Sequence, residues 1–263
     1  MHNAHMDQIC DDLVAEHAVL DALVADLDEA RWDEATASPG WSVRDQISHL
    51  WFFDRRALMA LSDPDEFAAD TKRLMAAGGT EASVAPGRAI TGASLLDAWR
   101  TDRTRMLEVA RAVDASVRVP WYGPAMGARS FVTARLMETW AHGQDVADAL
   151  GRTREPTERL RHVAHIGVRA RPFSYAIRQM QMPEADIHVA LTTPAGDTAT
   201  WGSPAAADSV RGPLLDFCLV VTQRRHRADT ALDIVGEAAQ EWMSIAQAFA
   251  GDPGSGRTPG QLG

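Results

Sequence analysis

One helical segment carries a row of polar side chains that constrains how this chain can fold. Arg135, Glu138, His142 and Asp145 follow one another at intervals of 3, 4 and 3 residues, so they share one face of a helix whose adjoining face is apolar. Burying a carboxylate without a partner costs on the order of several kcal/mol. A divalent metal ion would remove that cost, because Glu138 and His142 lie one turn apart and can reach the same ion. We therefore expect this helix to lie inside a bundle.

Spacing by itself is weak evidence for a metal site. The same Glu-x-x-x-His spacing recurs at Glu158–His162 and Glu184–His188. Glu138 also has a simpler alternative, which is an ion pair with Arg135. The metal hypothesis therefore needs a third ligand from elsewhere in the chain.

His49 is the candidate for that third ligand. It lies in the segment SVRDQISHLWFFD, an unusually apolar setting for a histidine. A lone histidine there is more often hydrogen-bonded within a core than bound to a metal. Together with Glu138 and His142, however, it completes a set of two histidines and one carboxylate, which leaves positions open for water or substrate. Zinc is the first candidate, and nickel, iron and manganese suit the same donors.

Residues 1–155 are expected to form a four-helix bundle. Ser42 with Asp45, and Ser94 with Asp97, resemble capping boxes that begin two of the helices. The connection 62–92 is long for a compact bundle, so we expect it to border the pocket or to form a lid, with a short helix at Asp65–Ala77. Apolar periodicity places the four long helices at 6–29, 42–61, 94–113 and 129–150.

The remainder, residues 156–250, is expected to form a smaller α+β domain, so the fold class is mainly α. Two strands with a turn between them are expected over 186–201, and a helix over 157–180 is interrupted at Arg171-Pro172. We also expect a helix over 206–223, a strand over 231–235 and a helix over 237–249. The Gly- and Pro-rich stretch 251–263 is expected to be a disordered tail.

Composition argues against several classes of function. The formal net charge is −10, which disfavours a nonspecific grip on nucleic acid. Cys10 and Cys218 are the only cysteines, so a disulfide framework is not expected and a reducing cytoplasm fits. No signal peptide is expected, and no apolar run approaches the roughly 20 residues needed to span a bilayer. The expected partner is a small-molecule substrate, bound by a monomer or a homodimer.

Two motifs give the chain a specific resemblance. GWSVRDQISHL, followed about ninety residues later by ETWAHGQDVADALG, resembles the DinB-like superfamily over roughly residues 8–152. The nearer likeness is to its mycothiol-dependent maleylpyruvate isomerase branch, including metal-binding actinobacterial relatives. This resemblance implies a bundle that holds a divalent metal, usually zinc, through His49, Glu138 and His142. It also implies that Asp145 lies near a thiol-cofactor pocket, where Arg135 is a second candidate contact.

The C-terminal stretch SVRGPLLDFCLVVTQRRHRADTALDIVGEAAQEW is similar to the α/β domain appended in that branch, which resembles sterol-carrier folds. The resemblance implies that an arginine of this domain reaches the active site. Arg224 and Arg225 both lie in the matching region. With Asp145, they are the candidate catalytic residues, and either arginine could hold a substrate carboxylate.

Three functions remain open from the sequence. A metal ion with this donor set could activate mycothiol or a similar thiol, which would add to an electrophile; the chain would then be an isomerase if the thiol is released and an S-transferase if it is retained. The alternatives are a thiol-independent hydrolase, lyase or cyclase, and a non-catalytic metal- or small-molecule-binding protein.

Further polar residues are weaker candidates. Glu16 or His17 could face the pocket or the solvent, and Asp54 could support His49, although a surface position is favoured. Tyr122 could be a pocket donor, although loop aromatics more often serve packing, and Cys10 has no neighbour in sequence that would activate it as a nucleophile.

Overall fold

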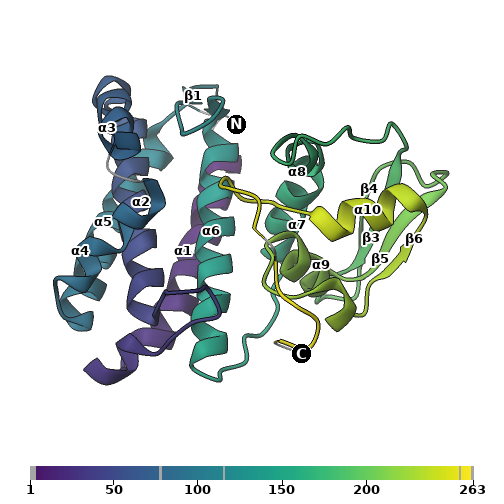
Figure 1. The fold of residues 1–263 in the computed structure, drawn as a ribbon. Helices are drawn as coiled ribbons and strands as arrows, with labels where there is room; N and C mark the ends of the chain where they lie inside the picture. Colours follow the sequence, from purple (N-terminus) through teal and green to yellow (C-terminus); the bar gives the residue numbers. More distant parts are fainter. Residues whose placement is uncertain (1–3, 77–78, 115, 255, 262–263) are drawn as a thin grey trace. The chain divides into compact units, whose positions relative to one another are not determined.

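A computed structural model describes residues 4–76, 79–114, 116–254 and 256–261 of the chain. The chain divides into two compact units, Met1–Thr153 and Arg154–Gly263. The first unit is helical and the second combines helices with a small sheet (Figure 1). The expected fold class, a helical bundle followed by a smaller α+β domain, is confirmed.

The first unit contains four long helices, α1, α2, α5 and α6. They lie side by side (Figure 1). Helix α2 packs against α5 and α6, and α1 packs against α6 and α5. Their apolar faces meet in one core that includes Leu20, Ile47, Trp99 and Val146. The bounds of the four helices are α1 (Ala4–Val24), α2 (Val43–Ser62), α5 (Gly92–Ala112) and α6 (Ala128–Ala149).

Side-chain hydrogen bonds to the backbone set where several helices of the first unit begin. The capping box at Ser42 and Asp45 is confirmed, with both reciprocal hydrogen bonds present. Helix α5 begins two residues earlier than expected, because the N-cap is Thr91, whose side chain accepts from the backbone N–H of Ser94. Helix α1 ends at Val24 and not near residue 29, and Asp28 then caps the 3-10 helix η1 (Glu29–Asp33).

The long connection between α2 and α5 is folded against the bundle. Its first helix confirms the short helix expected there, although residue 77 lies outside the described residues. Both α4 and η2 contact α2. The connection contains α3 (Pro64–Ala76), η2 (Gly79–Ser83) and α4 (Ala85–Arg88), and a two-stranded ladder of β1 (Arg118–Val119) with β2 (Met126–Gly127) lies within the loop before α6.

The second unit is built on a four-stranded sheet in the order β4-β3-β5-β6. Strands β3 and β5 are parallel, and the other two pairings are antiparallel. Helices α9 and α10 pack on this sheet, and α7 packs on α9 (Figure 1). The elements are α7 (Leu160–Arg169), α8 (Arg171–Ala176), β3 (Ile187–Thr192), β4 (Thr198–Trp201), β5 (Asp208–Pro213), α9 (Leu214–Val221), η3 (Arg227–Asp229), β6 (Asp233–Val235) and α10 (Glu237–Ile245).

The expected helix over 206–223 is wrong in its first part. Asp208–Pro213 is strand β5, whose residues pair in register with β3 from Ile187 to Thr192. Gly212 has a φ of 142°, which a helix does not accommodate, and Pro213 is the N-cap of α9. The expected break at Arg171-Pro172 is confirmed, because α7 ends at Arg169 and a separate helix begins at Arg171. Among the described residues, no helix is both long and apolar enough to cross a membrane.

Candidate metal centre

Three side chains from distant parts of the sequence meet between α2 and α6. One potential ligand atom each from His49, Glu138 and His142 lies within 4.8 Å of the other two. The two imidazole centroids are 4.5 Å apart, and Nε2 of His142 lies 3.3 Å from Oε2 of Glu138. His142 is 8% exposed, whereas His49 and Glu138 are only partly buried. The cluster therefore has both a buried wall and an accessible side.

Core packing explains why these residues converge. On α2, Ile47 and Leu50 are fully buried, and they belong to the same apolar core as Val146 of α6. These contacts hold the two helices together and set their rotation, so His49 on the neighbouring face of α2 faces the Glu138–His142 face of α6. Because Glu138 and His142 lie one helical turn apart, their side chains project from the same face of α6 and meet.

Directed hydrogen bonds determine which nitrogen of His142 is available. The hydroxyl of Thr36 donates to the carbonyl oxygen of Trp41 (2.9 Å), so its oxygen accepts from the amide NH2 of Gln46 (2.9 Å). This leaves Oε1 of Gln46 facing Nδ1 of His142 at 2.5 Å. An amide oxygen only accepts, so Nδ1 carries the proton and the lone pair is on Nε2. Nε2 is also the nitrogen beside Glu138.

His49 has a similar support from the connection between α2 and α5. Its Nδ1 lies 2.9 Å from Oγ of Ser83, a fully buried residue at the end of η2. Ser48 holds this segment in place, because its hydroxyl donates to the carbonyl oxygen of Ser83 at 2.8 Å. Partners of this kind on the far nitrogen are typical of metal-binding histidines, since they fix the ring orientation. We expected this connection to border the pocket, and Ser83 is its contact with the cluster.

An aromatic wall surrounds the two imidazoles. Trp41 stacks on His142 with centroids 6.0 Å apart and an interplanar angle of 17°, and Phe53 lies 4.6 Å from His49. Tyr122 packs edge-on against Phe53 at 5.7 Å. Burial raises the pKa of the Tyr122 phenol to about 12, so the hydroxyl stays protonated at neutral pH. Such a wall favours a ligand with an apolar portion.

The donor set fits a divalent cation. Two imidazoles and one carboxylate with oriented outer partners match a metal site that keeps open positions for other ligands. The fit rests on the short distances between the ligand atoms and on the hydrogen bonds to both Nδ1 atoms. Gln46, Thr36, Trp41 and Ser83 were not expected from the sequence. Only Gln46 gave a signal, as a polar residue three positions before His49 on a buried helix face.

Asp145 and Arg135 both lie buried on α6, one on each side of the cluster along the helix. Oδ2 of Asp145 accepts from the hydroxyl of Ser38 at 3.3 Å, in the same loop that carries Trp41. Nε of Arg135 donates to Oδ1 of Asp54 at 3.0 Å, and Trp99 donates to the other oxygen of Asp54 at 2.9 Å. Asp54 is thus fully buried, which corrects the surface position favoured from the sequence. The Arg135–Asp54 pair links α6 to α2.

Arg224 and Arg225 lie just after α9 in the second unit. Nη1 of Arg224 donates to the carbonyl oxygen of Thr222 at 2.7 Å, and Nη1 of Arg225 donates to that of Arg224 at 2.8 Å. These bonds place positive charge at the C-terminal end of the helix, where its dipole favours cations.

The remaining polar candidates are buried in the bundle. Glu16 and His17 both lie inside, where His17 meets the ring of Trp99 edge-on at 5.6 Å. Burial is the main cause that lowers the pKa of His17 well below its usual value, and Arg103 and Arg135 add to it. Burial also raises the pKa of the Cys10 thiol to about 11, so Cys10 is a poor nucleophile at neutral pH.

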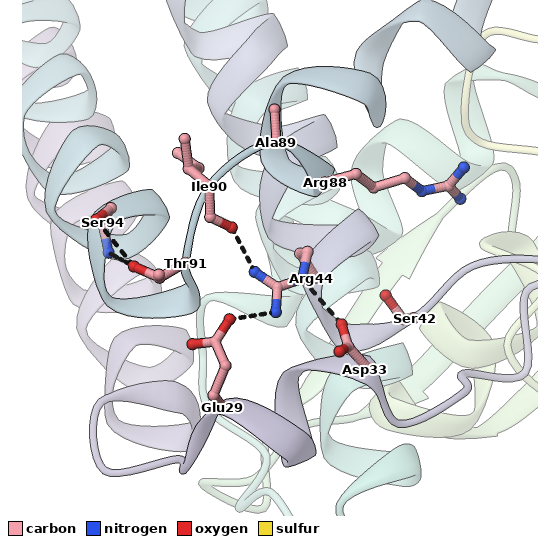
Figure 2. A pocket seen from close by; sticks show the side chains of 9 residues that line it. All are labelled: Glu29, Asp33, Ser42, Arg44, Arg88, Ala89, Ile90, Thr91 and Ser94. Carbon is pink, nitrogen blue, oxygen red and sulfur yellow. Dashed lines mark hydrogen bonds and ion pairs between the residues drawn. The ribbon is translucent and has the colours of Figure 1, made fainter.

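A hollow of about 740 Å³ lies elsewhere on the first unit (Figure 2). At its centre, Arg44 donates to Asp33, to Glu29 and to the carbonyl oxygen of Ile90, at 2.9, 2.6 and 2.7 Å. Glu29 also accepts from the backbone N–H of Gly92 at the start of α5. The charged groups that line the hollow therefore bind one another and join η1, α2 and α5. We interpret the hollow as part of the scaffold and not as a ligand site.

These features define a class of protein: a DinB-type helical bundle with a His2–Glu cluster and an appended α+β unit. The sequence model described as the mycothiol maleylpyruvate isomerase N-terminal domain matches residues 13–147. The chain belongs to this family. Two Mycobacterium tuberculosis proteins, from strains CDC 1551 / Oshkosh and ATCC 25618 / H37Rv, are each 47% identical to it over 248 residues. The matches cover 94% of this chain and 96% of each relative.

Solved structures share the fold. The crystal structure of the mycothiol-dependent maleylpyruvate isomerase aligns with a TM-score of 0.57 at 16% identity, over 83% of this chain and 89% of that one. A histidine-to-alanine mutant of the same enzyme aligns with the same score and coverage at 14% identity. At these identities the likeness shows a common architecture, and the chemistry has to be argued from the side chains.

Proposed function

We propose that this chain is a metal-dependent isomerase or S-transferase that uses mycothiol, or a similar small thiol, on a small electrophilic metabolite. The observation that carries the proposal is the meeting of His49, Glu138 and His142 with their ligand atoms within 4.8 Å. Family membership supports the thiol, because the matching family is described by its mycothiol-dependent isomerase. The two free cysteines are compatible with a reducing cytoplasm as its setting.

His49, Glu138 and His142 would hold the metal, with zinc as the first candidate. When bound, a divalent ion on such donors lowers the pKa of a thiol or water that joins it. Gln46 keeps the proton of His142 on Nδ1, and Ser83 positions the ring of His49. These contacts would preserve the shape of the site while its ligands exchange.

Asp145 is the proposed acid–base or cofactor-binding group. It lies one turn after His142 on α6, and its hydrogen bond to Ser38 ties it to the loop that carries Trp41. The aromatic wall of Trp41, Phe53 and Tyr122 would exclude water from one side of a bound thiol. Arg135 would act through its pair with Asp54, which holds α6 at its distance from α2. Arg224 or Arg225 would hold a substrate carboxylate.

A thermal-shift experiment tests the thiol. Metal-loaded protein is melted with and without mycothiol, and we expect the ligand to raise the melting temperature. The rise should disappear in His49→Ala and should persist in His5→Ala, which removes an exposed histidine from α1.

Two results would count against the proposal. If the protein binds a metal but no thiol raises its melting temperature, the thiol-independent hydrolase, lyase or cyclase takes its place. If metal analysis finds no bound ion and His142→Ala leaves metal titration unchanged, the metal centre itself is wrong.

A further inference from the structure

A second cavity lies entirely within the C-terminal unit and is lined by basic side chains. It has a volume of about 170 Å³, which is enough for an anion of several non-hydrogen atoms. None of the described residues that line it is Asp or Glu. Its basic lining consists of Arg178, Arg225, His226, Arg227 and Arg257.

Arg178 is held in place by only one of its nitrogens. Nη1 donates to the carbonyl oxygen of Ser174, one turn earlier in the chain, at 3.1 Å. Among the described residues, neither Nε nor Nη2 of Arg178 has a hydrogen bond or an ion pair. Burial alone lowers the pKa of this guanidinium. Arg178 is thus a positioned cation, half-buried without a neutralising carboxylate.

Arg227, the first residue of η3, is also held through only one of its nitrogens. Its Nη1 donates to the carbonyl oxygen and to the side-chain Oε1 of Gln240, at 2.9 and 2.8 Å. Its Nε and Nη2 form no hydrogen bond and no ion pair within the described part of the chain. Each of the two arginines is therefore oriented by one nitrogen and keeps two others for a ligand.

His226 adds a further donor. Its Nδ1 accepts from the backbone N–H of Ala228 at 3.1 Å, so a neutral ring carries its proton on Nε2. The C-terminal end of α9 explains part of the positive charge, because a helix end carries about half a negative charge. Arg178 and Arg227 are not engaged with that helix end by any hydrogen bond among the described residues, so their charge remains available in the cavity.

We propose that this cavity is a binding site for a small oxyanion, with Arg178 and Arg227 as its principal donors. Guanidinium groups bind phosphate and carboxylate oxygens by paired hydrogen bonds, and the cavity is too small for a long polyanion. Anion binding here requires neither the metal nor the thiol, although Arg225, proposed above as a carboxylate-holding residue, also lines the cavity. It assigns to the second unit the task of holding an anionic group, either of a substrate or of an effector.

Calorimetric titration of the full chain with inorganic phosphate and with malonate, at constant ionic strength, tests the proposal. We expect one site per chain, and tighter binding of phosphate or of malonate identifies which oxyanion is preferred. Arg178→Gln and Arg227→Gln should each weaken binding by about tenfold or more, since each removes charge-assisted hydrogen bonds. Arg178→Lys keeps the charge but loses the planar fork, so it should weaken binding less.

Controls separate this site from the metal centre and from general charge. Because phosphate also binds metals, each titration is repeated on His142→Ala protein treated with chelator, and binding should persist. Arg169→Gln makes the same charge change at an exposed position outside the cavity and should have no effect. The proposal is overturned if neither anion binds, if chelation abolishes binding, or if Arg169→Gln weakens it as much as Arg178→Gln. Thermal melts verify that the variants fold. If Arg178→Gln does not fold, the anion affinities of Arg227→Gln and Arg178→Lys test the proposal.

Discussion

At the scale of single residues, the cluster of His49, Glu138 and His142 depends on side chains other than the three proposed ligands. Gln46 accepts from Nδ1 of His142, and Thr36 sets the orientation of the Gln46 amide through the carbonyl oxygen of Trp41. A protonated Nδ1 leaves Nε2 free to bind a cation. If this acceptor is lost, the ring can rotate or adopt the other tautomer, and both changes weaken coordination.

Replacing Gln46 tests this support. Gln46→Met removes the acceptor at similar volume, so we expect metal affinity to fall by roughly 10–100-fold while the helices remain folded. Competition with a chromophoric chelator measures the affinity, and the 15N shifts of His142 in the metal-free protein report the tautomer. Gln144→Met on α6 serves as control, because Gln144 bonds to Asp148 and not to the cluster. Unchanged affinity and an unchanged tautomer in Gln46→Met would contradict the proposed orientation.

His17 gives a prediction for stability against pH. Its pKa in the folded chain is well below the usual 6.5, mainly because it is buried. As the pH falls below about 6.5, the unfolded chain gains a proton at His17 and the folded chain does not, so the free energy of unfolding falls by up to about 1.4 kcal/mol per pH unit. His17→Phe keeps a ring against Trp99 and should flatten this slope in urea denaturation between pH 7.5 and 5.5. His5→Phe is the control, and equal slopes for wild type and His17→Phe would refute the assignment.

The ligands and their supports differ in how well sequence predicts them. Helical periodicity placed Glu138 and His142 on one face, whereas His49 was nominated from its residue type, its apolar setting and the family resemblance. Thr36 and Ser83 gave no such signal, since their contacts arise only when two loops fold onto α2. Arg135 and Asp54 were separate candidates in the sequence, and only the packing of α2 against α6 shows that they form a buried pair.

At the scale of elements, the connection between α2 and α5 shows how a long loop is fixed against a helix. Gly87 lies so close to α2 that an added Cβ would come within 2.4 Å of the Cβ of Ser48. The backbone N–H of Gly87 donates to the Ser48 hydroxyl at 3.0 Å, and Arg88 forms two hydrogen bonds with Asp45. Ser48 in turn holds Ser83, which contacts His49.

Gly87→Ala is therefore expected to disturb both stability and the cluster. The new methyl group overpacks the contact with Ser48, so we expect a loss of about 1–3 kcal/mol in the free energy of unfolding. Metal affinity should also fall, because Ser83 moves with the displaced segment. Gly123→Ala, at a position where a Cβ meets no atom within 4 Å, should change neither. Denaturant unfolding and chelator competition give the two readouts, and a Gly87→Ala protein with normal metal affinity would show that the segment does not support His49.

Among the helices and strands, sequence-based prediction succeeds for the long helices and fails for strand β5. Long amphipathic helices were placed to within a few residues, because their periodicity is local. The strand β5 was mistaken for part of a helix, since the apolar run of α9 follows it directly and its pairing partner β3 is distant in the sequence. Parallel pairing depends on such distant contacts, and a window of neighbouring residues does not contain them.

At the scale of the whole molecule, the two units have separate cores, and the metal cluster belongs to only one of them. An ion bound by the three proposed ligands would join α2 to α6 and would add its binding free energy to the folded state of the first unit. Hydrogen exchange in the presence of chelator should therefore accelerate in the halves of α2 and α6 that carry His49 and His142. Exchange in the paired strands β3 and β5 should change little, because the hydrogen bonds that pair them lie within the second unit. Glu138→Gln supplies the control: it should show the faster exchange without chelator and little further response to it. Equal acceleration in both units would mean that the ion stabilises the chain through some route other than the contact between α2 and α6.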